Sequence, residues 1–464
     1  MRVTRTILQL AVPVAVAVVA MAIVASAGAA GTYAGPGAVS APYVRGEVVV
    51  GYASTASGTL ARAASMINGL RSTGPAEPGE EVLRLPTGES VQTAVAQLRH
   101  TPGVGYAVPN YLAHSAGGQF VPNDPGRTGR SKGWERMQWN FLAGSGVDAP
   151  GAWANLRADG HPGGQGVVVA IVDTGVAYRN WHQFRRSPDF TRAHFTEPYD
   201  FLAHDKFPLD RNGHGTFIAG IVAESTNNGR GLTGLAYGAT IMPVRVLSRN
   251  GWGNAATIAR GIRYAVNHGA QVINLSLEFD PSVTGAEIPD IISALQYAHR
   301  RGVVVVGSSG NEADTQMAYP ARSTDVISVG ATTKDRCLAE YSNTDRRLDL
   351  VAPGGGPDTA GLSDSTCHPD RNLPNIFQLT FPNPQRPKNF GFPSDWFGTS
   401  MSAAHVTGAA ALVIASGVVG KHPSPDRVLN RLESTAQPLG DPAPNADYGH
   451  GLLDAAAATA RATP

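Results

Sequence analysis

Continuous apolar runs alternate with helix-spaced segments over the C-terminal part of the chain. A strand covered on both faces reads as an unbroken run of Val, Ile and Leu, whereas a helix repeats apolar residues every three or four positions. Two helix-spaced segments end at a glycine, Ala256–His268 before Gly269 and Pro289–Arg301 before Gly302. The expected strands are Gly166–Val172, Ile241–Leu247, Val272–Leu277, Val303–Val306 and Val326–Val329. This alternation predicts an α/β domain, a doubly wound and mostly parallel sheet with helices on both faces.

A shorter pattern precedes this domain. Residues 47–52, 82–85 and 104–108 have strand patterns, and residues 60–71 and 90–98 have helical spacing. The β-α-β-α-β order predicts a small α+β unit of ferredoxin-like type over residues 44–111. Such a unit could be an independent binding module. Its position between a leader segment and a larger domain favours a pro-domain.

The segment between the two patterns, residues 112–165, is polar and rich in glycine, and it contains Pro122-Asn123-Asp124-Pro125. Clusters of Pro, Gly and Asn mark loops and turns. We therefore expect a linker and N-terminal extension here, followed by the main domain over residues 166–460.

The N-terminus has the features of a secretory signal over residues 1–29. Arg2 and Arg5 precede an apolar run from Ile7 to Val24, and Ala25-Ser26-Ala27-Gly28-Ala29 offers cleavage after Ala27 or Ala29. A retained membrane anchor is the alternative, because the run is near the short limit for spanning a bilayer. We expect cleavage and a secreted protein with no stable membrane span.

Composition narrows the function classes. Lys+Arg number 37 and Asp+Glu 36, so the balanced charge does not favour nucleic-acid or anionic-membrane binding. The chain has 54 Gly and 33 Pro, which is typical of a loop-rich enzyme rather than a helical bundle.

Secretion would place Cys337 and Cys367 in an oxidising compartment. A bridge between them would contribute roughly 3.6 kcal/mol on the chain-entropy model; two free thiols are the alternative.

Chemically capable residues follow the predicted strands and open the small-residue helices. The first strand of the main domain runs into Asp173-Thr174-Gly175, and Val303–Val306 runs into Gly307-Ser308-Ser309-Gly310-Asn311. Ligand sites of doubly wound sheets lie at these carboxyl ends. A third segment, Asn212-Gly213-His214-Gly215-Thr216, opens a small-residue helix. Its glycines allow close backbone approach, and His214 is the one histidine of 13 framed in this way.

Ser400 opens a second small-residue helix, which runs through Ile414. Free backbone N–H groups and the helix dipole favour developing negative charge at such an N-terminus, which suits a nucleophilic hydroxyl. A serine that only caps the helix is the alternative. The order Asp173, His214, Ser400 along the chain is one of the known orders of a serine-hydrolase triad.

These motifs resemble those of the subtilisin-like (subtilase, S8) serine peptidases: Asp-Thr-Gly at 173–175, His-Gly-Thr at 214–216 and Gly-Thr-Ser-Met at 398–401. The resemblance covers roughly residues 120–460, and residues 44–111 look like the family's inhibitor-type pro-domain. It implies a serine endopeptidase made as a self-processing zymogen, with Ser400 as nucleophile, His214 as general base and Asp173 orienting the imidazole. It also implies that Asn311 stabilises the oxyanion, although Gly-Asn is also ordinary turn chemistry.

The resemblance implies a substrate clamp and a calcium site as well. The clamp would hold an extended peptide by strand addition. Its residues would be Gly251, Trp252, Gly253, Ser276 and Leu277, although Trp252 alone could cap a loop. Glu312 lies near the position that shapes the primary specificity pocket, or is an exposed carboxylate.

The calcium residues would be Asp124, Asp189 and Asn228, each of which also suits a turn. A second calcium site is not expected, because Ala203 and Phe207 occupy acidic positions of that site.

Some positions depart from the family pattern. Ala404 stands where the family commonly has Pro, Phe217 where it frequently has His, and Glu278 where it commonly has Gly. The segment 354–396 is also longer than a minimal member needs. None removes a predicted catalytic group, but Glu278 and the long segment leave substrate preference open.

The rival hypothesis is a catalytically inactive subtilase fold that serves as a binding or scaffold protein. The complete triad and Asn311 count against it. A metal hydrolase is a weaker alternative, since no His-Glu-x-x-His occurs. The expected partners are protein or peptide substrates and the protein's own pro-domain as an intramolecular inhibitor. We expect a monomer that does not bind nucleic acid.

Overall fold

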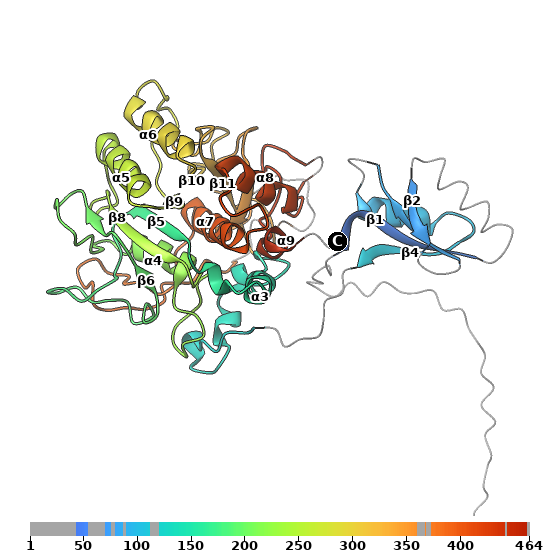
Figure 1. Cartoon of the computed structure of the whole chain (residues 1–464), viewed down its shortest axis with the longest axis horizontal. Helices are drawn as coiled ribbons and strands as arrows, with labels where there is room; N and C mark the ends of the chain where they lie inside the picture. Colours follow the sequence, from blue (N-terminus) through green and yellow to red (C-terminus); the bar gives the residue numbers. More distant parts are fainter. Residues whose placement is uncertain are drawn as a thin grey trace, which may run out of the picture. The chain divides into compact units, whose positions relative to one another are not determined.

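The computed structural model describes residues 43–53, 70–75, 79–86, 90–111, 120–359, 367, 373–440 and 443–461 (Figure 1). The predicted signal peptide lies outside these ranges. Residues 60–69 of the first predicted helix and residues 112–119 of the predicted linker also lie outside them.

The N-terminal unit is a four-stranded antiparallel sheet in the order β2-β3-β1-β4, with helix α2 packed on it. Its strands are β1 (Tyr43–Tyr52), β2 (Arg71–Pro75), β3 (Glu80–Arg84) and β4 (Val104–Tyr111), and α2 spans Val91–Arg99. Alternate strand residues such as Val48, Val50 and Leu83 are fully buried and form the core with α2. The predicted strands at 47–52, 82–85 and 104–108 are confirmed to within a few residues, whereas β2 was not predicted.

The main domain is built on a parallel sheet in the order β12-β11-β10-β9-β5-β8-β6, and β7 also pairs with β8. The central strands are β5 (Val168–Asp173), β8 (Thr240–Arg245), β9 (Val272–Leu275) and β10 (Val304–Ser308). The outer strands are β6 (His194–Phe195), β7 (Tyr199–Asp200), β11 (Ile327–Thr332) and β12 (Leu350–Pro353). The predicted parallel α/β fold is confirmed.

Both faces of this sheet are covered, which explains the unbroken apolar runs. In β5, Val169 and Ile171 belong to one core cluster, whereas Ala170 and Val172 belong to another. Figure 1 shows α5 and α6 on one side of the strands and α3, α7, α8 and α9 on the other. The helices are α3 (Ala149–Ala158), α4 (His214–Ala223), α5 (Ala255–Asn267), α6 (Pro289–Arg300), α7 (Thr399–Ser416), α8 (Pro425–Thr435) and α9 (Ala455–Thr459).

The segment expected to be a linker and extension is more structured than the sequence suggested. Residues 120–165 include α3 and short 3-10 helices, and Trp134, Phe141 and Trp153 are fully buried in the main core. The two indole N–H groups donate to backbone oxygens, Trp134 to Pro122 at 3.0 Å and Trp153 to Leu235 at 2.7 Å. Irregularly spaced aromatic anchors, rather than a periodic pattern, hold this segment in place.

Helix α7 is the central helix of the main domain. Most of its 18 residues are buried, and it contacts β9, β10, β11 and β12 as well as α4. In the described part of the chain it is the helix that is long and apolar enough to cross a bilayer, but 89% of that window is buried inside the protein. It is therefore a core helix, as the small-residue run predicted.

Candidate active site

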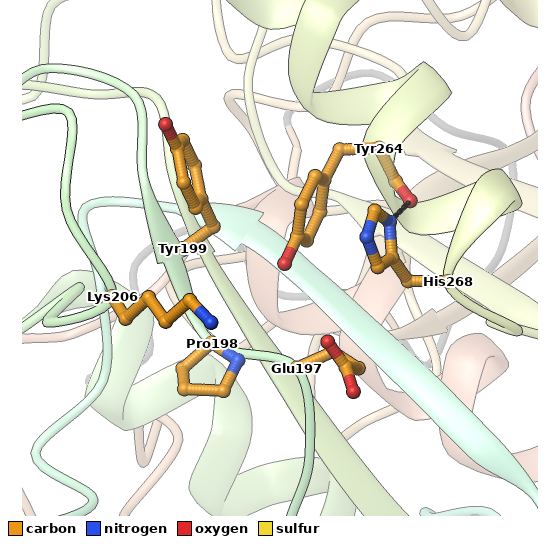
Figure 2. Close-up of a pocket in the computed structure, with 6 residues that line it drawn as sticks. All are labelled: Glu197, Pro198, Tyr199, Lys206, Tyr264 and His268. Atoms are coloured by element: carbon orange, nitrogen blue, oxygen red, sulfur yellow. Dashed lines mark hydrogen bonds between the residues drawn. The ribbon is translucent and has the colours of Figure 1, made fainter.

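Two surface pockets lie apart from the predicted site residues. One, of about 430 Å³, is lined by residues of β7, α5 and the loops beside them: Glu197, Pro198, Tyr199, Lys206, Tyr264 and His268 (Figure 2). The His268 Nδ1–H there donates to the Tyr264 backbone oxygen at 2.8 Å. The other, of about 540 Å³, is bordered by Arg185, Arg211, Arg249, Arg386 and Lys388. Neither pocket contains a predicted catalytic residue. The predicted catalytic residues lie instead at the edge formed by the carboxyl ends of the central strands.

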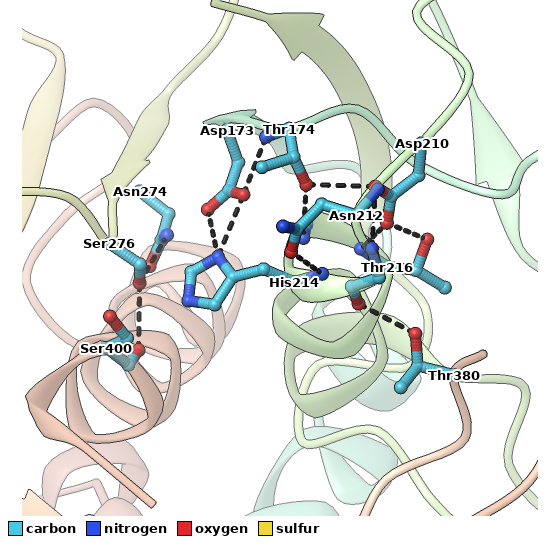
Figure 3. Close-up of polar contacts among 12 residues, drawn as sticks. Asp173, Thr174, Asp210, Asn212, His214, Thr216, Asn274, Ser276, Thr380 and Ser400 are labelled. Carbon is cyan, nitrogen blue, oxygen red and sulfur yellow. Dashed lines mark hydrogen bonds and ion pairs between the residues drawn. The ribbon is translucent and has the colours of Figure 1, made fainter. Parts of the chain in front are cut away.

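Asp173 and His214 are in direct contact at that edge (Figure 3). Asp173 is the last residue of β5 and is fully buried, and His214 opens α4. The His214 Nδ1 lies 2.9 Å from each carboxylate oxygen of Asp173. Burial lowers the pKa of His214, but the Asp173 carboxylate outweighs this effect and raises the pKa above its ordinary value. The contact fixes the tautomer with the proton on Nδ1 and leaves Nε2 free.

Ser400 lies in the first turn of α7, which packs against α4. The Ser276 hydroxyl donates to the Ser400 backbone oxygen at 2.8 Å, and the Asn274 side-chain amide donates to the Ser276 hydroxyl at 2.9 Å. Ser400 is half-buried. No hydrogen bond between its hydroxyl and His214 is among the described contacts. The structure therefore joins Asp173 to His214 directly and positions Ser400 through the packing of two helices.

Asp210 organises the loop that carries His214, and the sequence analysis missed it. Its buried carboxylate accepts from the backbone N–H groups of Asn212 and Gly213 at 2.9 Å each. It also accepts the Thr174 hydroxyl at 2.9 Å. Thr174 in turn accepts the Gly215 N–H at 2.9 Å. This network ties the end of β5 to the start of α4.

An aromatic stack supports the His214 imidazole. The centroid of the Trp396 ring lies 6.0 Å from that of the His214 ring, in stacked orientation. The ring of the fully buried Phe217 stacks on Trp396 with 4.7 Å between the centroids. Phe217 and Trp396 thus form a continuous apolar surface beside the imidazole. Trp396 comes from the long segment 354–396, and Thr380 of the same segment donates to the Gly213 oxygen at 2.7 Å. The described part of this segment therefore braces the His214 loop.

Asn311 follows β10 and is held by Thr399. Its Oδ1 accepts the Thr399 backbone N–H at 2.9 Å and the Thr399 hydroxyl at 3.1 Å. Its Nδ2 donates to both carboxylate oxygens of Glu278, at 3.2 Å each. The Glu312 carboxylate accepts the Asn311 backbone N–H at 3.0 Å. Thr399 therefore orients the side-chain amide of Asn311, the predicted oxyanion donor, and the Glu278 carboxylate accepts its N–H.

The predicted clamp residues flank this edge. Ser276 and Leu277 follow β9 directly and are buried. The segment around Gly251 is a tight turn in which the Trp252 oxygen accepts the Ser248 N–H at 2.8 Å, and the Trp252 side chain is 80% exposed. The Trp252 ring therefore packs little against its own loop.

The three predicted calcium residues come together from distant segments. The Asn228 backbone N–H donates to Asp124 at 3.0 Å, and its side-chain amide donates to Asp189 at 2.7 Å. Asp124 and Asp189 are buried, and no described basic side chain forms an ion pair with either. Both oxygens of the fully buried Glu224 lack a hydrogen-bond partner. Burial raises the pKa of Asp189 to about 7 and that of Glu224 well above its usual range. Buried oxygen ligands that form no ion pair fit a divalent cation.

The predicted disulfide is confirmed. Cys337 and Cys367 are bonded across 30 residues of sequence. Asp358 lies close to both sulfur atoms, but bonded cysteines offer no thiolate to a metal ion.

Comparisons with known proteins agree with this geometry. Sequence profiles match the subtilase family (peptidase S8) at residues 164–451 and the fervidolysin N-terminal prodomain at residues 32–110. Similar proteins include the thermophilic serine proteinase of Bacillus sp. strain AK1, 34% identical over 71% of this chain and 67% of the relative. They also include thermitase of Thermoactinomyces vulgaris, 31% identical over 69% of this chain and 93% of the relative.

Among solved structures, a protease from Pseudoalteromonas arctica aligns with a TM-score of 0.58 and 29% identity, covering 73% of this chain and 99% of that protein. With the sequence profile, the relatives and the parallel sheet in agreement, the chain belongs to the subtilase family of serine proteases and carries an N-terminal prodomain.

Proposed function

We propose that this subtilase is a secreted endopeptidase that cleaves peptide bonds with Asp173, His214 and Ser400 through an acyl-enzyme. The observation that carries the proposal is the contact between His214 Nδ1 and the buried Asp173. Because Asp173 holds the proton on Nδ1, Nε2 can take the proton of the Ser400 hydroxyl during attack on the scissile carbonyl. His214 then returns that proton to the leaving amine.

Two donors would stabilise the tetrahedral intermediate. Ser400 lies in the first turn of α7, where backbone N–H groups have no partner within the helix. Asn311 Nδ2 would be the second donor, since Thr399 fixes the orientation of its amide. Substrate would lie extended along Ser276-Leu277 on one side and Gly251-Trp252-Gly253 on the other, bonded through its backbone.

Calcium would be held by Asp124, Asp189 and Asn228. The ion would supply positive charge to a buried acidic cluster and tie residues 123–124 to the loop after α4. Glu224 lies next to this cluster and would gain the same charge compensation, because its pKa is raised in part by Asp189.

The proposed precursor consists of a signal peptide (1–29), an inhibitory pro-domain (44–111), an extension (112–165) and the peptidase (166–460). Self-cleavage would fall between Tyr111 and Val121, which keeps Asp124 on the mature chain. The polar Ser115-Ala116-Gly117-Gly118 suits an extended cleavable segment. We propose that the mature enzyme is a monomer.

The test compares wild type with Ser400→Ala and with Ser434→Ala, a matched change at an exposed serine. Casein hydrolysis and precursor mass are measured together. Loss of a triad serine lowers kcat by about 10⁶-fold, so Ser400→Ala should be inactive and remain uncut, while Ser434→Ala behaves as wild type. Near-wild-type turnover of Ser400→Ala would reject the mechanism. A folded wild type that cleaves nothing would favour the scaffold hypothesis.

A further inference from the structure

The amide that would stabilise the oxyanion is engaged by a carboxylate. Thr399 binds the Asn311 Oδ1 with two donors, so the Nδ2 side of the amide faces Glu278. Nδ2 lies 3.2 Å from both oxygens of Glu278. A substrate oxygen that reaches this N–H must therefore approach the Glu278 carboxylate or displace it.

A second carboxylate increases the negative charge at this point. Glu312 accepts the Asn311 N–H at 3.0 Å and the Asn343 side-chain amide at 2.7 Å, so its position is fixed. No described Lys or Arg forms an ion pair with Glu278 or Glu312. Burial raises the pKa of Glu278 to about 7, and the charge of Glu312 adds to this rise. The pair therefore has no Lys or Arg partner among the described residues, and the nearby titratable group that favours the charged form of Glu278 is His214.

This arrangement has a consequence for peptide hydrolysis. Negative charge develops on the carbonyl oxygen in the transition state, and a neighbouring carboxylate opposes it. Because Glu278 is bonded to the donor that would bind this carbonyl oxygen, the side chain of the same substrate residue would approach Glu278. A cation on that side chain would take over the Glu278 carboxylate and leave Asn311 Nδ2 free for the oxyanion.

We propose that Glu278, supported by Glu312, makes this protease select substrates with Lys or Arg as the residue whose carbonyl is attacked. The proposal rests on the proposed function, because it assigns Asn311 to the oxyanion. With an uncharged substrate side chain, the Glu278 carboxylate stays hydrogen-bonded to Asn311 Nδ2. Substrate binding is then weaker, and the chemical step is slower. Glu278 is thus a specificity-determining residue.

The experiment uses mature enzyme and peptides that differ only at that residue, which is Arg, citrulline, Lys, norleucine or Phe. Citrulline has the shape of arginine without its charge. Wild type should show kcat/KM at least 30-fold higher for Arg than for citrulline. Glu278→Gln should reduce this ratio to below 5 and raise kcat/KM for citrulline severalfold. Glu312→Gln should reduce the ratio partly, and Glu287→Gln, at an exposed glutamate, should leave it unchanged.

A binding measurement separates charge recognition from turnover. The inhibition constant of p-aminobenzamidine, a cation that is not hydrolysed, should be at least 10-fold higher for mature Glu278→Gln than for mature wild type. A wild-type Arg to citrulline ratio near 1, or a ratio that survives Glu278→Gln, would overturn the proposal while leaving the peptidase assignment intact. Absence of hydrolysis of every peptide by folded wild type would instead reject the proposed function and this inference with it.

Discussion

Thr216 donates both its backbone N–H and its hydroxyl to one carboxylate oxygen of Asp210, at 2.9 and 2.6 Å. The other oxygen of Asp210 accepts donors from Thr174 and from the backbone before α4 (Figure 3). Asp210 therefore connects the strand that ends in Asp173 to the helix that begins with His214, without touching either residue in the described hydrogen bonds.

Asp210→Asn should reduce activity through the position of His214. An amide cannot accept all of these donors, and an unmatched buried polar group costs about 1 to 3 kcal/mol. We expect a fall in kcat of about 10-fold and a lower unfolding midpoint in urea. Asp345→Asn is the control: it loses an ion pair with Arg347 outside the site, so its urea midpoint should fall while kcat stays unchanged. Full activity of Asp210→Asn would show that the network does not position His214.

Trp396→Ala should lower kcat more than it changes KM, because the indole supports His214 through ring stacking. Trp396→Phe keeps an aromatic ring between His214 and Phe217 and should recover most of the activity. The readout is the pH profile of kcat. If Trp396 positions the imidazole, the alanine variant should shift the acidic limb. Equal loss in the alanine and phenylalanine variants would point to indole-specific contacts instead.

Removal of calcium should destabilise the mature protein. A ligand at a thousandfold excess over its Kd stabilises by about 4.1 kcal/mol, so EDTA should lower Tm and calcium should restore it. Asp189→Asn should abolish this response. A melting curve that is the same with EDTA and with calcium would contradict the site.

The calcium response should also depend on pH. Without an ion, the folded-state pKa of Asp189 is about 7, above its ordinary value of 3.8. The folded apo protein therefore binds a proton that the unfolded chain lacks, and its stability falls as pH rises from about 4 to 7. Calcium competes with that proton. The Tm increase caused by a fixed calcium concentration should thus be larger at pH 8 than at pH 6.

His405 should make the folded state sensitive to acid. It is fully buried, its Nδ1–H donates to Met401 at 2.7 Å, and its Nε2 accepts from Asn140 at 2.7 Å, so only the neutral ring fits. Burial lowers its pKa to about 4 from 6.5. The unfolded chain therefore binds more protons between these values. Stability from this residue is lost as pH falls from about 6.5 to 4, by on the order of 3 kcal/mol. His405→Gln should flatten this part of the urea stability profile.

The sequence placed the reacting residues more reliably than their supports. Asp173 directly follows an apolar run, and Asn311 comes five residues after another such run, so the fold predicted that both lie at the carboxyl ends of parallel strands. Asp210 lies between Leu209 and Arg211 in what looks like a polar loop. Its hydrogen bonds include one with Thr174, which is 36 residues away and near it only in space.

Other features depend on long-range packing in the same way. Trp396 was not predicted because nothing near it in sequence indicates that it stacks on His214. Trp134 and Trp153 lie in a segment without periodicity, so their burial in the main core could not be read from a pattern. Glu278 was noted as a departure, but its bond to Asn311 joins the ends of two different strands.

The position of Ser400 on α7 has a consequence for how the enzyme loses activity. Local opening of loops can occur well below the free energy of global unfolding, whereas elements packed in the core open only with the whole domain. Helix α7 contacts five strands, and Ser400 is its second residue. Heat or denaturant should therefore inactivate the mature enzyme in the same transition that melts the sheet. Hydrolytic activity would then report global unfolding, while fluorescence from the exposed Trp252 could change earlier.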